Sequence, residues 1–225
     1  MRLSVIIPAL NEESSLPATL AALQPQHPFE VIVVDGGSTD ATRAAAAPLC
    51  DRVLEAPRGR AAQMNAGAAA ARGEALLFLH ADCVPEEGAL AEAARLLRDP
   101  AVAAGCFGMR VQARGLVYRL IDGCAAARVR RTGIVYGDQG LFLRRETFER
   151  AGGFPPLRLM EDVFLSLCLR RLGRVVVARR RLFVSPRRWR RVGPVRQTLR
   201  NWALTALAAA GVHPDRLARH YPAVR

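Results

Sequence analysis

Short apolar runs recur along the first hundred residues. Leu3–Ile7, Val31–Val34 and Ala75–Leu79 are runs of apolar side chains, interrupted only by Ser4. Runs of this length are typical of strands that are buried on both faces of a sheet. A weaker run at 51–54 predicts a further short strand. Pro8 is expected to end the first strand, because proline cannot donate a hydrogen bond to a neighbouring strand.

Helical patterns lie between these runs. Leu16, Leu20 and Leu23 recur at helical spacing after Ser14 or Ser15, either of which can cap a helix. An Ala-rich helix is expected after the turn sequence 35–40, and further helices are predicted at 61–71 and 86–98. Strands that alternate with helices in this way predict an α/β fold, in which a mostly parallel sheet is flanked by helices.

The second half of the chain is less regular. Strands are predicted at 102–111, 140–143 and 175–178, and a helix is predicted over Glu161–Leu172, before Gly173. An amphipathic helix is expected over 195–210. Since no Ser- or Gly-rich linker interrupts the sequence, we expect one domain spanning residues 1–225.

The charge is strongly asymmetric. The chain has no lysine, and its 33 basic residues, all arginine, give a net charge of +13. Residues 1–109 carry 8 Arg against 13 acids, whereas residues 110–225 carry 25 Arg against 7 acids. A GC-rich genome also favours arginine, but the asymmetry indicates a basic half that faces a ligand's phosphates, a membrane surface or nucleic acid.

The five cysteines are scattered and show no C-x-x-C spacing. This pattern argues against a zinc site or a disulfide framework, and it is typical of a reducing compartment. We expect them to be small core residues. No secretory leader and no membrane-spanning segment are apparent, so a cytoplasmic protein is expected.

Acids and amides follow three of the predicted strands, at 8–12, 35–40 and 80–83. In parallel sheets, ligands bind at the carboxyl ends of the strands. The chain has neither a G-x-x-x-x-G-K-[ST] loop nor a G-x-G-x-x-G motif, which disfavours a P-loop ATPase and an NAD enzyme. Carboxylates at these ends instead suit a divalent cation bound between protein and diphosphate, with Asp82 as its ligand. A turn aspartate before Pro85 is the alternative.

Three further features have both a chemical and a structural interpretation. Asp35 can accept a hydrogen bond from a base or a ribose hydroxyl, or can simply form the turn at Gly36. Arg58 and Arg60 can lie beside a nucleotide or on a solvated loop. The pair Glu161 and Asp162 can supply a general base, or can be the acidic first turn of a helix.

Together these segments resemble family 2 glycosyltransferases of the GT-A fold, in particular a subgroup of short bacterial members without membrane helices. The matching pieces run in order from residue 3 to about residue 190. They are VIIPALNE (5–12), VVDGGSTD (33–40), GRAAQMNAG (59–67), LHAD (79–82), YGDQG (136–140), GGFP (152–155) and MED (160–162).

The resemblance implies a GT-A, Rossmann-like sheet with a nucleotide-binding half (1–109) and an acceptor-side half (110–225) that includes a basic C-terminal segment and helix. It implies an inverting transfer that uses a nucleotide-sugar donor, with a UDP-sugar favoured, and Mg²⁺ or Mn²⁺. Its implied site residues are as follows: Pro8, Ala9, Glu12, Asp35 and Arg60 for the nucleotide, Asp82 for the metal, Asp162 as base with Glu161 in support, and Gly152, Gly153, Phe154, Arg188 and Trp189 on the acceptor side.

The sequence departs from the family pattern at two places. The metal motif has a single acid, Asp82, preceded by His80, which can contribute to metal binding. The Q-x-x-R-W motif of processive members is reduced to Arg188 and Trp189, with Ser185 in the place of glutamine. Processive synthesis is therefore disfavoured. Arg187, Arg188 or Arg191 can stabilise the leaving diphosphate.

Two other functions remain open at this point. A nucleotidyltransferase would require a Gly-rich basic loop after the first strand, which the sequence lacks. A nucleic-acid-binding module would use the Arg-rich segment 179–200, but few aromatic residues are interleaved there for base stacking. The same segment and the Trp202 helix can instead lie on an anionic membrane leaflet, which would bring the enzyme to a lipid-linked acceptor. Nucleic acid is not the favoured partner.

Overall fold

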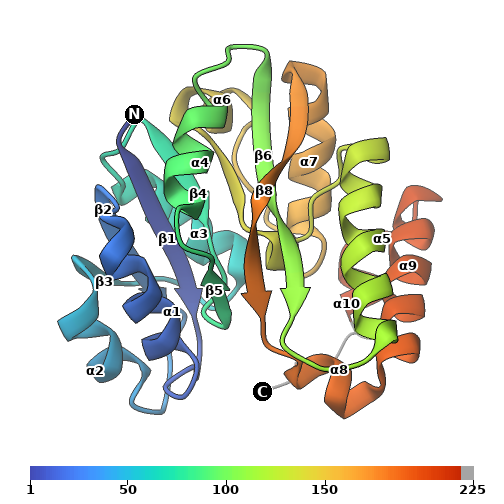
Figure 1. The fold of residues 1–225 in the computed structure, drawn as a ribbon, viewed down its shortest axis with the longest axis horizontal. Helices are drawn as coiled ribbons and strands as arrows, with labels where there is room; N and C mark the ends of the chain where they lie inside the picture. The colour runs from blue at the N-terminus through green and yellow to red at the C-terminus, as the bar shows by residue number, and fades with distance from the viewer. Residues whose placement is uncertain (219–225) are drawn as a thin grey trace.

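The computed structural model describes residues 1–218 of the chain. An eight-stranded sheet forms its centre, with the strand order β3-β2-β1-β4-β7-β6-β8-β5 (Figure 1). The strands are β1 (Leu3–Ala9), β2 (Glu30–Asp35), β3 (Arg52–Glu55), β4 (Ala75–Phe78), β5 (Cys83–Pro85), β6 (Val102–Val111), β7 (Leu141–Arg144) and β8 (Arg174–Val184).

Ten α-helices and three short 3₁₀ turns connect these strands within the described residues. The helices are α1 (Leu16–Leu23), α2 (Thr42–Ala46), α3 (Arg60–Ala70), α4 (Ala89–Leu96), α5 (Leu116–Thr132), α6 (Arg145–Arg150), α7 (Glu161–Leu172), α8 (Arg187–Val192), α9 (Pro194–Ala209) and α10 (Pro214–Ala218). The 3₁₀ turns are η1 (Gln24–Gln26), η2 (Ala47–Leu49) and η3 (Gly137–Gln139). No helix in the described part of the chain has the length and apolar character needed to cross a membrane.

The directions of the strands determine which loops lie together at each edge of the sheet. β1 runs parallel to β2 and β4, and β3 runs parallel to β2, so their carboxyl ends lie at one edge of the sheet. β7 is antiparallel to β4 and β6, so the amino end of β7 lies at this edge as well. β8 is parallel to β6 and contributes its carboxyl end. We call this edge the carboxyl rim; the arrowheads of β1, β6 and β8 point to it at the bottom of Figure 1.

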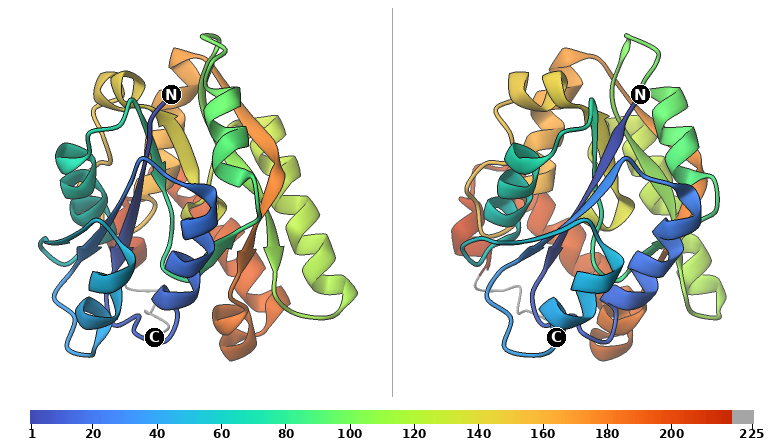
Figure 2. Two further views of the ribbon diagram at one scale, coloured as in Figure 1. Left: turned by 60° about the vertical axis from the view of Figure 1, so that its left-hand side comes forward. Right: turned by 90° about the vertical axis from the view of Figure 1, so that its left-hand side faces the viewer.

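Two apolar clusters cover the faces of the sheet. Leu16, Leu20 and Leu23 of α1 pack with α4 residues on one face. α3, α6 and α7 contribute buried side chains to the cluster on the other face. The helices accordingly flank the sheet on both sides (Figure 2). The predicted mixed α/β architecture with a mostly parallel sheet is confirmed, since four of its seven strand pairs are parallel.

Several predicted boundaries are wrong for identifiable reasons. β1 continues through Pro8 to Ala9, because β4 pairs with β1 only as far as Ile6 and needs no N–H from Pro8. The helix predicted from residue 86 begins at Ala89. Gly88 adopts a left-handed backbone conformation, and the Glu86 N–H donates to the carbonyl oxygen of Arg181 in β8. No helix was predicted where α5 lies.

The expectation that all the cysteines are core residues is wrong in part. Cys83 and Cys106 are buried, Cys50 is half-buried, and Cys124 and Cys168 are exposed on α5 and α7. All five are free thiols. The predicted helix at 161–172 coincides with α7, and the C-terminal helix is α9. The last residues of the single domain expected over 1–225 lie outside the described part.

Candidate functional site

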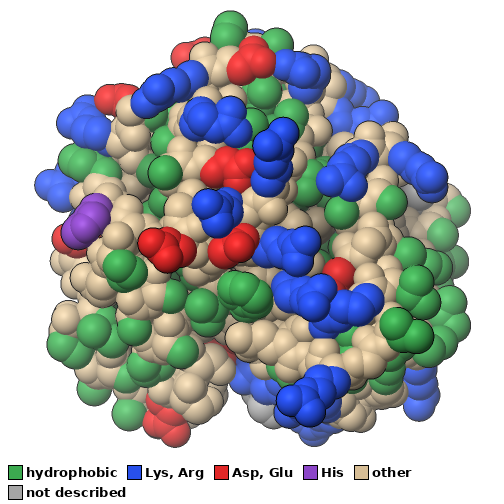
Figure 3. All heavy atoms as spheres, viewed as in Figure 1, with side chains coloured by type: hydrophobic (Ala, Val, Ile, Leu, Met, Phe, Trp, Pro, Cys, Tyr) green, Lys and Arg blue, Asp and Glu red, His purple; other side chains and the backbone are tan. Residues whose placement is uncertain are grey.

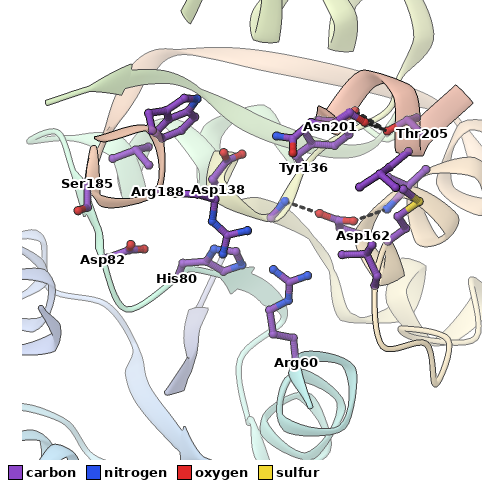
Figure 4. Close-up of a pocket in the computed structure, with 17 residues that line it drawn as sticks. Arg60, His80, Asp82, Tyr136, Asp138, Asp162, Ser185, Arg188, Asn201 and Thr205 are labelled. Carbon is purple, nitrogen blue, oxygen red and sulfur yellow. Dashed lines mark hydrogen bonds between the residues drawn. The ribbon is translucent and has the colours of Figure 1, made fainter. Parts of the chain in front are cut away.

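Two adjoining pockets open at the carboxyl rim. The first, which we call the β1 pocket, has a volume of about 300 Å³ and lies beside the loop after β1. The second, the α9 pocket, has a volume of about 140 Å³ and lies against α9 (Figure 4). Five residues line both pockets, so the two form one continuous site: Arg60, His80, Asp82, Leu159 and Arg188.

The β1 pocket is rich in arginine. Pro8 and Ala9, at the end of β1, and Glu12, in the loop after it, line the pocket. Five arginines border the pocket. Arg58 and Arg60 lie just before and at the start of α3, Arg187 and Arg188 come from α8, and Arg158 lies in the loop before α7. Such a concentration of positive charge suits a ligand with several phosphate oxygens.

Asp82 lies at the junction of the two pockets. Its Oδ2 is 3.4 Å from Nη2 of Arg187, which also bonds to Glu12. His80 is two residues earlier, and its Nε2 is buried without a hydrogen-bond partner among the described residues. Burial, together with the charges of Arg60 and Arg188, lowers the pKa of His80 to about 3, so the imidazole is neutral at pH 7.

These side chains fit a divalent cation. The ligand atoms of His80, Asp82 and Cys83 lie within 4.8 Å of one another. Burial raises the pKa of the Cys83 thiol well above its usual value, so Cys83 stays a thiol. One carboxylate and one neutral imidazole leave several coordination positions for a ligand's phosphate oxygens, a common arrangement for Mg²⁺ and Mn²⁺.

Asp162 faces the α9 pocket from the first turn of α7. Its Oδ2 accepts the Gly137 N–H at 2.6 Å, and its Oδ1 accepts the Val163 N–H at 2.8 Å. These bonds hold the carboxylate in one orientation. The preceding Met160 adopts a left-handed conformation, with φ of 65°, which is uncommon for a residue other than glycine and is often found at functional sites.

Glu161 is placed differently from Asp162. Its side chain is 2 % exposed, its Oε1 forms an ion pair with Nε of Arg60 at 2.7 Å, and its Oε2 accepts a hydrogen bond from Nη2 of Arg60 at 3.4 Å. Burial raises the pKa of Glu161, while the charge of Arg60 opposes this effect and that of Asp162 adds to it. Glu161 lines neither pocket, so it positions Arg60.

Asp138 is a site residue for which the sequence analysis assigned no role. It lies in η3, lines the α9 pocket, and has an Oδ1 without a hydrogen-bond partner among the described residues. Burial raises the pKa of Asp138, and the charge of Asp162 raises it further, whereas Arg128 and Arg188 lower it. Figure 4 shows Asp138 close to Arg188 and His80.

α9 supplies polar groups that the sequence analysis also missed. Asn201 and Thr205 line the α9 pocket beside Tyr136, whose hydroxyl lies 2.8 Å from Oγ1 of Thr205. Nothing in their spacing indicated a site, because only the packing of α9 brings them there. Arg188 and Trp189, which were expected on the acceptor side, do line this pocket.

The other expected residues lie outside both pockets. Asp35 is buried, and its carboxylate accepts hydrogen bonds from the N–H groups of Gly37 and Ser38. Gly152, Gly153 and Phe154 form a loop held by Asn65, which exchanges two hydrogen bonds with the backbone of Phe154. These residues organise the loops around the site, and none of them lines it.

Comparison with known proteins adds independent information. The model of the glycosyl transferase family 2 matches residues 4–154. The dolichyl-phosphate beta-glucosyltransferase of Drosophila melanogaster is 37% identical over 131 residues, which cover 47% of this chain and 40% of that protein. An undecaprenyl-phosphate 4-deoxy-4-formamido-L-arabinose transferase of Pseudomonas fluorescens is 37% identical over 99 residues, or 37% of this chain and 29% of that protein. The matches thus span less than half of these relatives.

Solved structures share the fold. The mannosyltransferase PcManGT from Pyrobaculum calidifontis, in complex with GDP-Man and Mn²⁺, superposes with a TM-score of 0.64 at 26% identity, covering 79% of this chain and 56% of that one. TarS 1-349 of S. aureus superposes with a TM-score of 0.65 at 21% identity, covering 83% and 61%. At 21% identity, the similarity to TarS shows a shared fold only.

Proposed function

Because the chain belongs to glycosyl transferase family 2, we propose that it transfers a sugar from a nucleoside-diphosphate donor to an acceptor hydroxyl with inversion at the anomeric carbon. The observation that carries this proposal is the continuity of the two pockets. An arginine-lined pocket beside Asp82 opens directly into one that contains the oriented carboxylate of Asp162.

The β1 pocket is the proposed donor site. The diphosphate would lie among Arg58, Arg60, Arg187 and Arg188, with the nucleoside toward Pro8 and Ala9. A UDP-sugar is the favoured donor. PcManGT, whose structure contains GDP-Man and Mn²⁺, supports a nucleotide-sugar donor and a divalent cation.

Asp82 and His80 would hold Mg²⁺ or Mn²⁺ against the diphosphate. When bound, the cation supplies Lewis-acid stabilisation of the negative charge that develops on the leaving group. Arg187 and Arg188 add positive charge at the same place. The neutral imidazole of His80 keeps a lone pair available because its pKa is lowered to about 3.

Asp162 is the proposed base. As the acceptor oxygen forms its bond to the anomeric carbon, the bond from that carbon to the diphosphate oxygen breaks. The hydroxyl proton passes to the Asp162 carboxylate. The N–H groups of Gly137 and Val163 fix this carboxylate in place without consuming all of its acceptor positions.

A lipid-linked hydroxyl compound is the proposed acceptor class. The α9 pocket combines apolar side chains from Leu159, Val163 and Leu204 with polar groups from Asn201 and Thr205. Relatives named for dolichyl-phosphate and undecaprenyl-phosphate substrates support a polyprenyl-linked acceptor. The mixed lining suits a polar head that is joined to an apolar chain.

A single substitution tests the assigned base. Asp162→Asn keeps the shape of the side chain but cannot take up a proton, so kcat is expected to fall by about 10²- to 10⁴-fold with donor affinity kept. Asp99→Asn, at an exposed position outside both pockets, serves as the control. Near-normal turnover in Asp162→Asn would exclude Asp162 as the base.

Donor class can be measured directly. Thermal shifts with UDP-, GDP- and dTDP-sugars, each with and without Mn²⁺, should show metal-dependent stabilisation by one nucleotide. Proton NMR of the product then reports whether the anomeric configuration is inverted. Stabilisation by none of the three classes would contradict the assignment of the donor site.

A further inference from the structure

α9 exposes an apolar stripe on the side opposite the site. Val195, Leu199 and Trp202 are 58%, 55% and 48% exposed. Their spacing of four and three residues places them on one face of the helix. Asn201 and Leu204, on the other face, line the α9 pocket. The stripe is therefore continuous along the helix and is not used for packing the site.

α5 extends this stripe. Leu116 and Leu120, one turn apart at the start of α5, are 83% and 68% exposed. α5 and α9 are in contact and run side by side from the end of the molecule that carries the carboxyl rim (Figure 1). Hydrophobic side chains gather on this side of the molecule in Figure 3. We call Leu116, Leu120, Val195, Leu199 and Trp202 the α5–α9 surface.

Positive charge borders the α5–α9 surface. Arg190, Arg191 and Arg196 are exposed next to the stripe, and Arg114 is exposed just before α5. Between residues 187 and 218 the sequence carries seven arginines and a single acid, Asp215. Exposed arginines thus lie beside the exposed apolar groups of both helices.

We propose that the α5–α9 surface docks on an anionic lipid bilayer. Apolar side chains with a partly exposed tryptophan and flanking arginines have the composition of a helix that lies in the membrane interface. The arginines would bind lipid phosphates while Leu199 and Trp202 enter the acyl boundary. A second copy of the chain suits this surface less well, because pairing two such surfaces would bring like charges together.

The α5–α9 surface lies near the carboxyl rim, where the two pockets open. α8 and the start of α9 lie at the carboxyl rim, and Arg188 and Trp189 of α8 line the α9 pocket. A bilayer bound to this end would lie next to the pocket opening. A lipid-linked acceptor anchored in that bilayer would then be held near the carboxyl rim, at which the α9 pocket opens. Vesicle binding itself needs no donor, so it can be measured independently of glycosyl transfer.

Vesicle cosedimentation tests the proposal. The full chain is expected to bind vesicles of phosphatidylglycerol and phosphatidylcholine, and not vesicles of phosphatidylcholine alone. Leu199→Ser with Trp202→Ser should lower the partition coefficient by at least about tenfold. Arg190→Gln with Arg196→Gln should lower it by about fivefold for each arginine. Leu167→Ser on α7 and Arg98→Gln are the matched exposed controls and should bind normally.

Tryptophan fluorescence gives a second measurement. Trp189 is 6% exposed and Trp202 is 48% exposed, so vesicle binding should shift the Trp202 emission to the blue. The Trp202→Phe variant should show no blue shift but should still sediment with the anionic vesicles. Absence of binding to anionic vesicles, or equal binding by the Leu199→Ser, Trp202→Ser variant, would overturn the proposal. So would a dimer in solution that this variant dissociates, because the surface would then be a subunit interface.

Discussion

Arg187 bonds to both carboxylate oxygens of Glu12, with Nη2 at 2.9 Å from Oε1 and 3.1 Å from Oε2, and the same nitrogen lies 3.4 Å from Oδ2 of Asp82. The hydrogen bonds to Glu12 raise the pKa of Arg187 above its usual value. One guanidinium group therefore links the loop after β1 to the loop after β4. In the absence of a metal ion, the guanidinium group of Arg187 supplies the positive charge beside the Asp82 carboxylate.

Removing Arg187 should strengthen cation binding in the absence of donor. Arg187→Gln frees the carboxylates of Glu12 and Asp82, and the dissociation constant for Mn²⁺ is expected to fall by about five- to tenfold, which corresponds to about 1 kcal/mol for a half-buried ion pair. Titration with Mn²⁺ followed by electron paramagnetic resonance measures this directly. Arg190→Gln, three residues along α8 at an exposed position, is the control. Weaker Mn²⁺ binding in Arg187→Gln would show that Arg187 assists the cation and does not compete with it.

Gly137 should not tolerate a side chain. A Cβ at this position would lie 2.5 Å from Nε2 of His80 and 3.5 Å from Oδ2 of Asp162. Gly137→Ala is expected to displace the imidazole and to reduce activity by about 10²-fold, the loss expected when a reacting group is misplaced by about 1 Å. The thermal midpoint should change far less than activity does.

Gly123 is the matched control for Gly137. It lies in the middle of α5, and an added Cβ would meet no atom within 4 Å. Gly123→Ala should leave activity unchanged and stabilise the fold by about 0.5–1 kcal/mol, because alanine favours the helix. Equal activity in both variants would contradict the close approach of Gly137 to His80.

The sequence predicted the buried strands and the acids that follow them. Asp82 and the helix start at Glu161 are found where the patterns indicated, since continuous apolar runs and an acidic first turn depend on local sequence. Asp138 was missed for a topological reason. It precedes β7 in the chain, and only the antiparallel direction of β7 brings that amino end to the carboxyl rim.

β8 was predicted at less than half its length for a related reason. Arg179, Arg180 and Arg181 look like a solvated basic segment, yet they belong to a strand. Their backbone N–H groups bond to the carboxylates of Glu92 and Glu86 near a register shift with β6. Partners so distant in the sequence cannot be inferred from local patterns.

Asp138 and Asp162 can be distinguished by paired substitutions. Both line the α9 pocket, and burial raises the pKa of Asp138. If Asp162 is the base, Asp138→Asn should lower kcat by about tenfold or less, while Asp162→Asn causes the larger loss. The pH dependence of kcat for both variants checks this. A larger loss in Asp138→Asn, together with the disappearance of the acidic limb of the pH profile, would assign the base to Asp138.

Glu30 should make the stability of the fold depend on pH. Its side chain is fully buried, where Ser4 Oγ donates to Oε1 at 2.6 Å and Nε of Arg72 lies 3.2 Å from Oε2. Burial acts to raise the pKa of Glu30, but these hydrogen bonds and the Arg72 charge outweigh it, and the pKa is lowered from 4.5. The unfolded chain therefore binds this proton more readily, so the stabilisation is present above about pH 4.5 and is lost as the pH falls through the lower folded pKa.

Glu30→Gln should consequently lower the free energy of unfolding by about 1–3 kcal/mol at pH 7, because the ionised acceptor is replaced by a neutral one. The difference from the wild type should shrink between pH 4.5 and pH 3. Urea unfolding at several pH values measures both effects. Glu74→Gln is the control, since Glu74 pairs with Arg2 at an exposed position where the pair contributes about 0–1 kcal/mol. A difference between Glu30→Gln and the wild type that stays constant from pH 7 down to pH 3 would mean that folding does not lower the pKa of Glu30.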